Sequence, residues 1–100
     1  MEVFIFNRLD DIRLLFKKHG AERAFLFGSA AKGQMTTESD VDFLFSFPAE
    51  MDFEAYSDNY FALAHALEAL LGRRVDLVAE KTLQNPYLIA SIENSKVRLM

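Results

Sequence analysis

Two aspartates, Asp40 and Asp42, stand one residue apart in DVDFLFSF, a segment that otherwise has the composition of a hydrophobic strand. Residues two apart in a strand point to the same face, with Cα atoms about 6.6 Å apart. Two charges at that distance repel each other by roughly 2.5 kcal/mol at an effective dielectric of about 20. That cost is large beside the stability of a small domain, about 5–15 kcal/mol. The pair must therefore be solvated, paired with basic residues or neutralised by a cation.

A third acid, Asp76, interrupts another apolar strand, RRVDLVA, in the same way. If the residues on either side of Asp76 face the core, Asp76 faces the opposite side, as Asp40 and Asp42 do. Three carboxylates can then converge on the open face of one sheet. Oxygen ligands with room for water suit Mg²⁺ or Mn²⁺ rather than zinc, and such sites commonly hold phosphates through two ions.

Each acid also has an ordinary explanation when it is taken alone. Asp40 follows a serine and can cap the start of a strand. Asp76 can pair with Arg73 or Arg74, which precede it by two or three residues. The metal-site interpretation therefore depends on the acids occurring together with a second motif.

That motif is FGSAAKG, which ends an apolar strand. Gly28 and Gly33 allow a ligand to approach the backbone closely, and Ser29 offers a hydroxyl and an amide at a strand-to-helix turn, where an anion is favoured. The segment can hold phosphates. It is not the nucleoside-triphosphatase loop, because Lys32 precedes Gly33 instead of following it. Lys32 is interpreted equally well as a phosphate ligand or as a surface lysine.

The elements that must position these residues are predicted from hydrophobic periodicity, turn residues and helix caps. They are a helix over 5–19, strands over 23–27, 40–47 and 73–79, a helix over 53–71, a helix over 86–93 and an edge strand over 96–100. The pattern predicts an α+β fold: one domain over residues 1–100, with a small mixed β-sheet and helices packed on one face. The stripe of Tyr56, Tyr60 and Phe61 has helical spacing, which favours a place in the core over a base-stacking role.

Composition excludes several classes of function. The chain has 100 residues, 51% of them hydrophobic, a net charge of −4 and a pI near 5.1, so direct binding of nucleic acid is not expected. It has no cysteine, hence no disulfide framework or thiolate zinc site. No segment is typical of a signal peptide or a membrane span. We expect a soluble, cytoplasmic protein that is not bound to membranes.

The combined pattern resembles the minimal nucleotidyltransferases of the DNA polymerase beta-like superfamily. Gly28-Ser29, ten intervening residues, Asp40-Val41-Asp42 and the later Asp76 match the family motif over essentially the whole chain. The resemblance implies transfer of a nucleoside monophosphate, AMP from ATP, to a hydroxyl. By the same resemblance Asp40 and Asp42 bind both metal ions, and Asp76 completes one metal site and helps deprotonate the acceptor.

The resemblance extends to the phosphates and to a partner. It implies that Gly28 and Ser29 bind the terminal phosphates. Family members often have arginine where this chain has Lys32, and lysine keeps the charge but loses the bidentate fork of arginine. Similar proteins are commonly antitoxins of helical HEPN-class ribonuclease toxins, and some add AMP to a toxin tyrosine. The resemblance therefore implies an adenylyltransferase that forms a hetero-oligomer with such a toxin. A non-catalytic antitoxin that acts by occlusion is the alternative, and transfer to a small molecule is disfavoured because 100 residues enclose few pockets.

Overall fold

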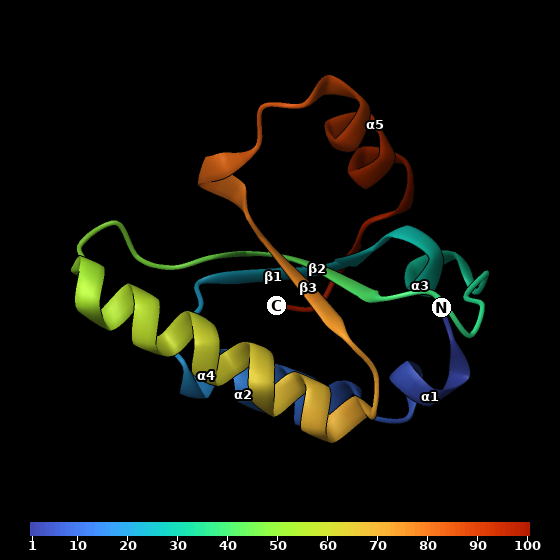
Figure 1. Cartoon of the computed structure of the whole chain (residues 1–100), viewed down its shortest axis with the longest axis horizontal. Coiled ribbons are helices and arrows are strands. Elements are labelled where there is room, and N and C mark those ends of the chain that lie inside the picture. The colour runs from blue at the N-terminus through green and yellow to red at the C-terminus, as the bar shows by residue number, and fades with distance from the viewer.

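The computed structural model describes all 100 residues, and Figure 1 shows the course of the chain. The elements in chain order are α1 (Val3–Phe6), α2 (Leu9–Lys18), β1 (Arg23–Phe27), α3 (Gly28–Lys32), β2 (Val41–Ser46), α4 (Phe53–Leu71), β3 (Val75–Ala79), the 3₁₀ helix η1 (Glu80–Thr82), α5 (Pro86–Ser95) and β4 (Val97–Arg98). No helix combines the length and the apolar character needed to cross a membrane.

The four strands form one sheet in the order β3-β2-β1-β4. Strand β1 is antiparallel to both β2 and β4, whereas β2 and β3 run parallel. The parallel pair requires a crossover, which α4 supplies. The predicted mixed sheet and α+β class are therefore confirmed, and the C-terminal segment forms the edge strand expected for it.

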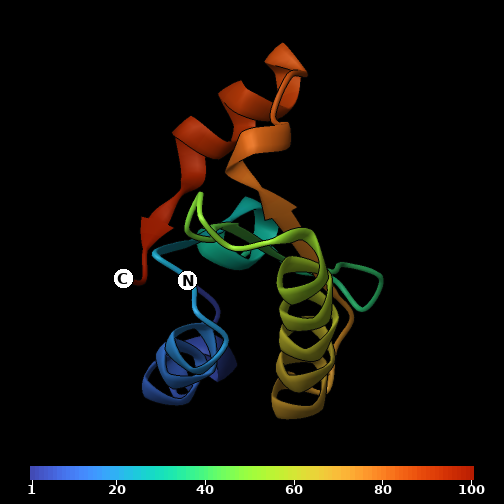
Figure 2. The ribbon, with the colours of Figure 1, turned by 90° about the vertical axis from the view of Figure 1, so that its left-hand side faces the viewer.

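The main core lies between one face of the sheet and the pair α2 and α4, which lie side by side in Figure 2. The alternation in β2 directs Val41, Phe43 and Phe45 into this core, where all three are fully buried. Leu63 and Leu67 of α4 are equally buried and pack in the same cluster. The alternation leaves Asp42 on the opposite face of β2.

The opposite face carries a smaller apolar cluster of Phe27, Leu44 and Ile92. Ile92 belongs to α5, which lies across the sheet from α2 and α4 in Figure 2. The expectation that helices pack on one face holds for α2 and α4 but is incomplete, because α5 covers part of the second face. Since the pattern of α5 is weakly amphipathic, its sequence does not indicate which face it covers.

The N-terminal segment is two helices, α1 and α2, where one continuous helix was predicted. The Glu2 amide donates to the Ala30 carbonyl at 2.9 Å, and the Glu2 carboxylate accepts from the Met35 amide at 2.8 Å. These bonds fix α1 beside α3, while α2 packs on the sheet, so the chain changes direction after Phe6. Ile5 is nevertheless buried, as its place in the pattern predicts.

Helix α4 has the predicted bounds: it is capped by the Asp52 side chain, which accepts from the Ala55 amide, and ends at Gly72 with a φ of 66°. Phe53, the first residue of the helix, is 87% exposed. Phe61 is 59% exposed, so the predicted aromatic stripe lies only partly in the core.

The C-terminus closes the sheet on β1. The Leu99 amide donates to the Ala24 carbonyl at 2.8 Å, and the Leu99 carbonyl accepts from Arg13 Nε of α2 at 2.8 Å. Leu99 itself is only 4% exposed. This last segment therefore belongs to the folded core.

Candidate active site

The site begins with two acids on neighbouring strands. Asp42 of β2 pairs in register with Asp76 of β3, and Phe27 at the end of β1 pairs with Asp42 from the other side. Residues paired in this way project to the same face, so Asp42 and Asp76 lie on the face opposite α2 and α4. Asp42 is half-buried, whereas Asp76, on the edge strand, is exposed.

The electrostatics of Asp42 reflect both of the other acids. Burial first, and then the negative charges of Asp76 and Asp40, together raise the pKa of Asp42 to about 6. A carboxylate with this pKa lacks a nearby cation strong enough to offset its neighbours. A divalent ion at this position would reverse the effect, because it favours the ionised form.

Asp40, just before β2, is oriented differently. Arg74 Nε lies 3.1 Å from Asp40 Oδ1. The contact lacks hydrogen-bond geometry, so Oδ1 is buried without a hydrogen-bond partner. No group of three or more His, Cys, Asp or Glu side chains is arranged to hold a metal ion. The expected convergence is thus partial: the acids share a region, but their carboxylates are not gathered as a coordination set, because Asp40 faces Arg74.

Gly28 forms the wall beside Asp42. Its φ is 72°, and a Cβ placed on it would meet Asp42 Oδ2 at 2.5 Å. Any side chain at this position would therefore displace the carboxylate, in addition to the strain of the left-handed backbone. The absence of a side chain leaves the carboxylate open to a ligand from the side of α3.

The Gly28 amide, which the sequence assigns to phosphate, is occupied in this structure. It donates to Ser95 Oγ of α5 at 2.9 Å, and Ser95 Oγ donates in turn to the Ser91 carbonyl at 2.8 Å. A phosphate oxygen that binds this amide would have to replace the serine hydroxyl.

The remaining phosphate candidates lie along α3. Ser29 is half-buried in its first turn, and Lys32 is exposed as its last residue. Gly33 ends the helix in the left-handed conformation with a φ of 70°, and the Gln34 amide bonds the Ser29 carbonyl at 2.9 Å. Because α3 has five residues, Lys32 lies about 6 Å along the axis from Gly28. The structure places Gly28 and Ser29 next to Asp42, and Lys32 and Gly33 at the far end of the helix.

Three residues that the sequence does not assign to the site also shape it. Arg74 faces Asp40 rather than Asp76, and Arg73 donates to the carbonyls of Thr36 and Ser39, which fixes the loop before Asp40. The sequence indicates Arg73 and Arg74 only as possible partners for Asp76. No local pattern points to Ser95, because it lies 67 residues from the Gly28 amide that it binds.

The donor set fits a hard divalent cation. All candidate ligands are carboxylate oxygens, which Mg²⁺ and Mn²⁺ prefer. The buried Asp40 Oδ1 has a free acceptor position, and Gly28 leaves space at Asp42 Oδ2. For Asp40 to bind such an ion, its carboxylate would have to turn away from Arg74.

Similarity to known proteins agrees with this geometry. The sequence model of the family described as "Nucleotidyltransferase domain" matches residues 9–99. A "putative protein adenylyltransferase" of Methanocaldococcus jannaschii is 38% identical over 85 residues, which cover 85% of this chain and 83% of that protein. "Protein adenylyltransferase MntA" of Thermococcus cleftensis is 37% identical over 73 residues, covering 71% and 68% of the two chains.

Two solved structures have the same fold. A "putative minimal nucleotidyltransferase" superimposes with a TM-score of 0.75 at 33% identity, covering 97% of this chain and 95% of that one. The complex of a tri-AMPylated Shewanella oneidensis HEPN toxin with an MNT antitoxin matches with a TM-score of 0.66 at 21% identity, covering 95% and 71%. The matched residues contain Gly28-Ser29 and all three acids, and the chain therefore belongs to the nucleotidyltransferase domain family.

Proposed function

We propose that this chain transfers AMP from ATP to a tyrosine hydroxyl of a HEPN-type ribonuclease toxin and thereby acts as its antitoxin. The observation that carries the proposal is the register of Asp42 with Asp76 beside Gly28, where a side chain would collide with the Asp42 carboxylate. Two carboxylates next to a backbone with room for phosphate fit nucleotidyl transfer better than a structural ion pair.

The reaction joins the acceptor oxygen to the α-phosphorus of ATP. The bond between that phosphorus and the oxygen bridging to the β-phosphate breaks, and pyrophosphate leaves. The hydroxyl proton passes to Asp76 or through it to solvent; this role fits an exposed carboxylate on the edge strand, because an acceptor can approach it. Gly28 and Ser29 bind the terminal phosphates, and Lys32 with Gly33 lies where the phosphate chain can extend along α3.

Two Mg²⁺ or Mn²⁺ ions would supply charge neutralisation for the triphosphate and the leaving pyrophosphate. Asp40 and Asp42 would hold both ions, and Asp76 would complete one of the two sites. The raised pKa of Asp42 supports this assignment, because a bound cation would offset the repulsion that Asp76 and Asp40 exert on the ionised Asp42 carboxylate.

A protein acceptor agrees with the shape and charge of the chain. The largest cavities are at other positions, so the acids have no enclosing walls for a small substrate. A docked protein can bring its own hydroxyl and exclude water. The net charge of −4 favours a basic ribonuclease partner. The names of the relatives support adenylylation of a protein, and one structure of the same fold is an antitoxin bound to an AMPylated HEPN toxin.

The test is to incubate this chain with a HEPN-type toxin from an adjacent reading frame, ATP and Mg²⁺, and to measure intact mass. We expect the toxin to gain adenylate units, its RNA cleavage to stop, and EDTA to prevent both. No gain in mass with the wild-type chain would contradict the enzymatic proposal.

Occlusion without catalysis is the second candidate, and two contacts favour it. Asp40 faces Arg74, and the Gly28 amide is occupied by Ser95, as in a site that no longer binds its ligands. The variant Asp42→Asn separates the candidates. Equal suppression of RNA cleavage by wild type and variant, with no adenylate on the toxin, is the result expected of an occluding module.

A further inference from the structure

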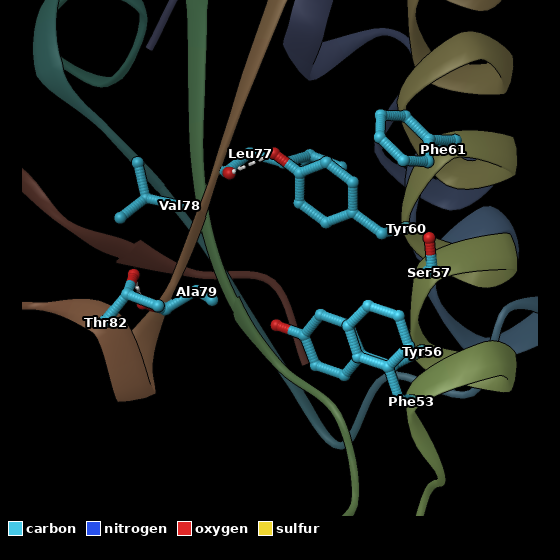
Figure 3. Close-up of a pocket in the computed structure, with 9 residues that line it drawn as sticks. All are labelled: Phe53, Tyr56, Ser57, Tyr60, Phe61, Leu77, Val78, Ala79 and Thr82. Carbon is cyan, nitrogen blue, oxygen red and sulfur yellow. Dashed lines mark hydrogen bonds between the residues drawn. The ribbon is translucent and has the colours of Figure 1, made fainter.

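A groove of about 440 Å³ lies between α4 and the edge strand β3. Figure 3 shows the aromatic side chains of α4 facing β3 across this groove. It is lined by Phe53, Tyr56, Tyr60 and Phe61 from α4 and by residues 77–79 of β3. Phe53 and Phe61 are among the most exposed large apolar residues of the chain, at 87% and 59%. A hydrophobic groove of this volume is large enough for a ligand or for the side chain of a partner.

The groove cannot easily take an added strand, although β3 is at the edge of the sheet. Three of its outward groups are already bonded: the Val75 amide to Glu68 at 3.1 Å, the Leu77 carbonyl to the Tyr60 hydroxyl at 2.9 Å, and the Ala79 carbonyl to the Thr82 hydroxyl at 2.9 Å. These bonds block pairing with another strand. They also hold the walls in place, so the groove is preformed for a side chain.

The groove adjoins the acceptor side of the candidate active site. Leu77, which lines it, follows Asp76 directly in β3. The Tyr60 hydroxyl donates to the carbonyl of Leu77, the residue after Asp76, at 2.9 Å. Burial and then the negative charge of Asp76 raise the pKa of that hydroxyl. Asp76 lies on the face of the sheet opposite α4, whereas the groove lies on the α4 side of β3. A docked segment that crosses the edge of β3 can therefore contact both.

Two acidic residues of α4 are neighbours in sequence of residues that line the groove. Glu54 and Asp58 stand four residues apart on the exposed side of α4, next to Phe53, Ser57 and Phe61. Like charges at this spacing repel each other, and the ion pairs of the chain involve neither residue. A basic partner would relieve this repulsion and bind in water with electrostatic steering.

We propose that the groove between α4 and β3 docks the acceptor protein, which inserts one large apolar side chain there while its neighbouring basic residues contact Glu54 and Asp58 and its hydroxyl reaches Asp76. The inference rests on the proposed function and specifies how the acceptor is recognised. The β3 residues that line the groove, 77–79, follow Asp76 by one to three positions. A short segment that crosses the β3 edge can therefore supply both the inserted side chain and the acceptor tyrosine.

The chain contains no tryptophan, so a tryptophan in a probe peptide can be observed alone. The probe is the capped peptide acetyl-KRWAYKR-amide. Its control is acetyl-KRAAYKRW-amide, which has the same charged residues and carries the tryptophan at the end. We expect a blue shift of tryptophan emission and perturbed amide resonances at Ser57, Phe61 and Val78 for the first peptide only. Equal binding of the two peptides, or perturbations away from the groove, would overturn the inference.

Variants of exposed residues give the matched comparison without loss of the fold. Phe61→Ala should weaken binding of the first peptide at least fivefold, whereas Leu14→Ala, at a similarly exposed residue of α2, should not change it. Glu54→Lys with Asp58→Lys should weaken it in low salt, unlike Asp10→Lys. Unchanged affinity in both groove variants would overturn the inference.

Two further outcomes separate the explanations. If Phe61→Ala weakens binding of Mg²⁺-ATP instead of the peptide, the groove holds the nucleobase and the inference is wrong. If AMP is still transferred to the HEPN-type toxin but neither peptide nor toxin depends on the groove, the docking inference fails while the proposed function stands. If the peptide docks as expected and no adenylate is ever transferred to any acceptor, it is the proposed enzymatic function that fails.

Discussion

At the scale of single residues, Asp42 combines a half-buried position with two negative neighbours. Its pKa in the folded chain, about 6, is above the ordinary aspartate value of 3.8. A group whose pKa rises on folding binds more protons when folded, so its contribution favours the folded state below about pH 4 and is lost as the pH rises through about 6. Without metal, Asp42 therefore makes the folded chain less stable at neutral pH than in mild acid.

The variant Asp42→Asn removes this effect. In EDTA at pH 8 we expect its free energy of unfolding to exceed that of the wild type by about 1–2 kcal/mol, less than the full pKa shift implies because solvent screens a partly exposed group. At pH 4 the two proteins should be equally stable. Urea denaturation at both pH values provides the measurement. Mg²⁺ at pH 8 should stabilise the wild type alone, and a variant less stable than the wild type at pH 8 would mean that Asp42 has a structural role.

At the scale of elements, α5 holds the amide at the start of α3 through Ser95. In Ser95→Ala the Gly28 amide loses its partner, so we expect the nucleotide-free chain to lose about 1 kcal/mol of stability. If a phosphate binds the Gly28 amide in place of Ser95, the variant loses less stability when nucleotide is bound than when it is absent. The affinity for Mg²⁺-ATP should then rise up to about fivefold, which calorimetry can measure. An affinity lowered by the variant would indicate that the Gly28 amide does not bind phosphate.

Particular elements also show what the sequence could and could not predict. The alternation in β2, the cap and stop of α4 and the Asn85-Pro86 start of α5 are local signals, and the structure has those elements. The break after α1 and the bond from Gly28 to Ser95 depend on contacts between segments far apart in the chain, which no local pattern carries. The same limit applies to the site: spacing brings Asp42 opposite Asp76, but only the folded chain shows Arg74 turned to Asp40.

At the scale of the whole molecule, the net charge of −4 should govern the encounter with a basic partner. Electrostatic steering raises the association rate and is screened by salt, whereas contacts in an apolar groove depend little on it. We expect the association rate with a HEPN-type toxin to fall about tenfold or more between 50 mM and 500 mM NaCl, with a smaller change in the dissociation rate. Surface plasmon resonance measures both rates, and a salt-independent association rate would contradict this account.

The closure of the sheet by the C-terminus has a consequence for synthesis. Leu99 is buried and its backbone is bonded to Ala24 and to Arg13 of α2, so residues at opposite ends of the chain complete the same core. During translation, one edge of β1 remains without its partner strand until residues 97–100 have left the ribosome. The native sheet therefore forms only after residues 97–100 have been made. A product truncated before residue 97 would keep all three acids but leave the β1 edge unpaired, so we expect cellular proteases to degrade it.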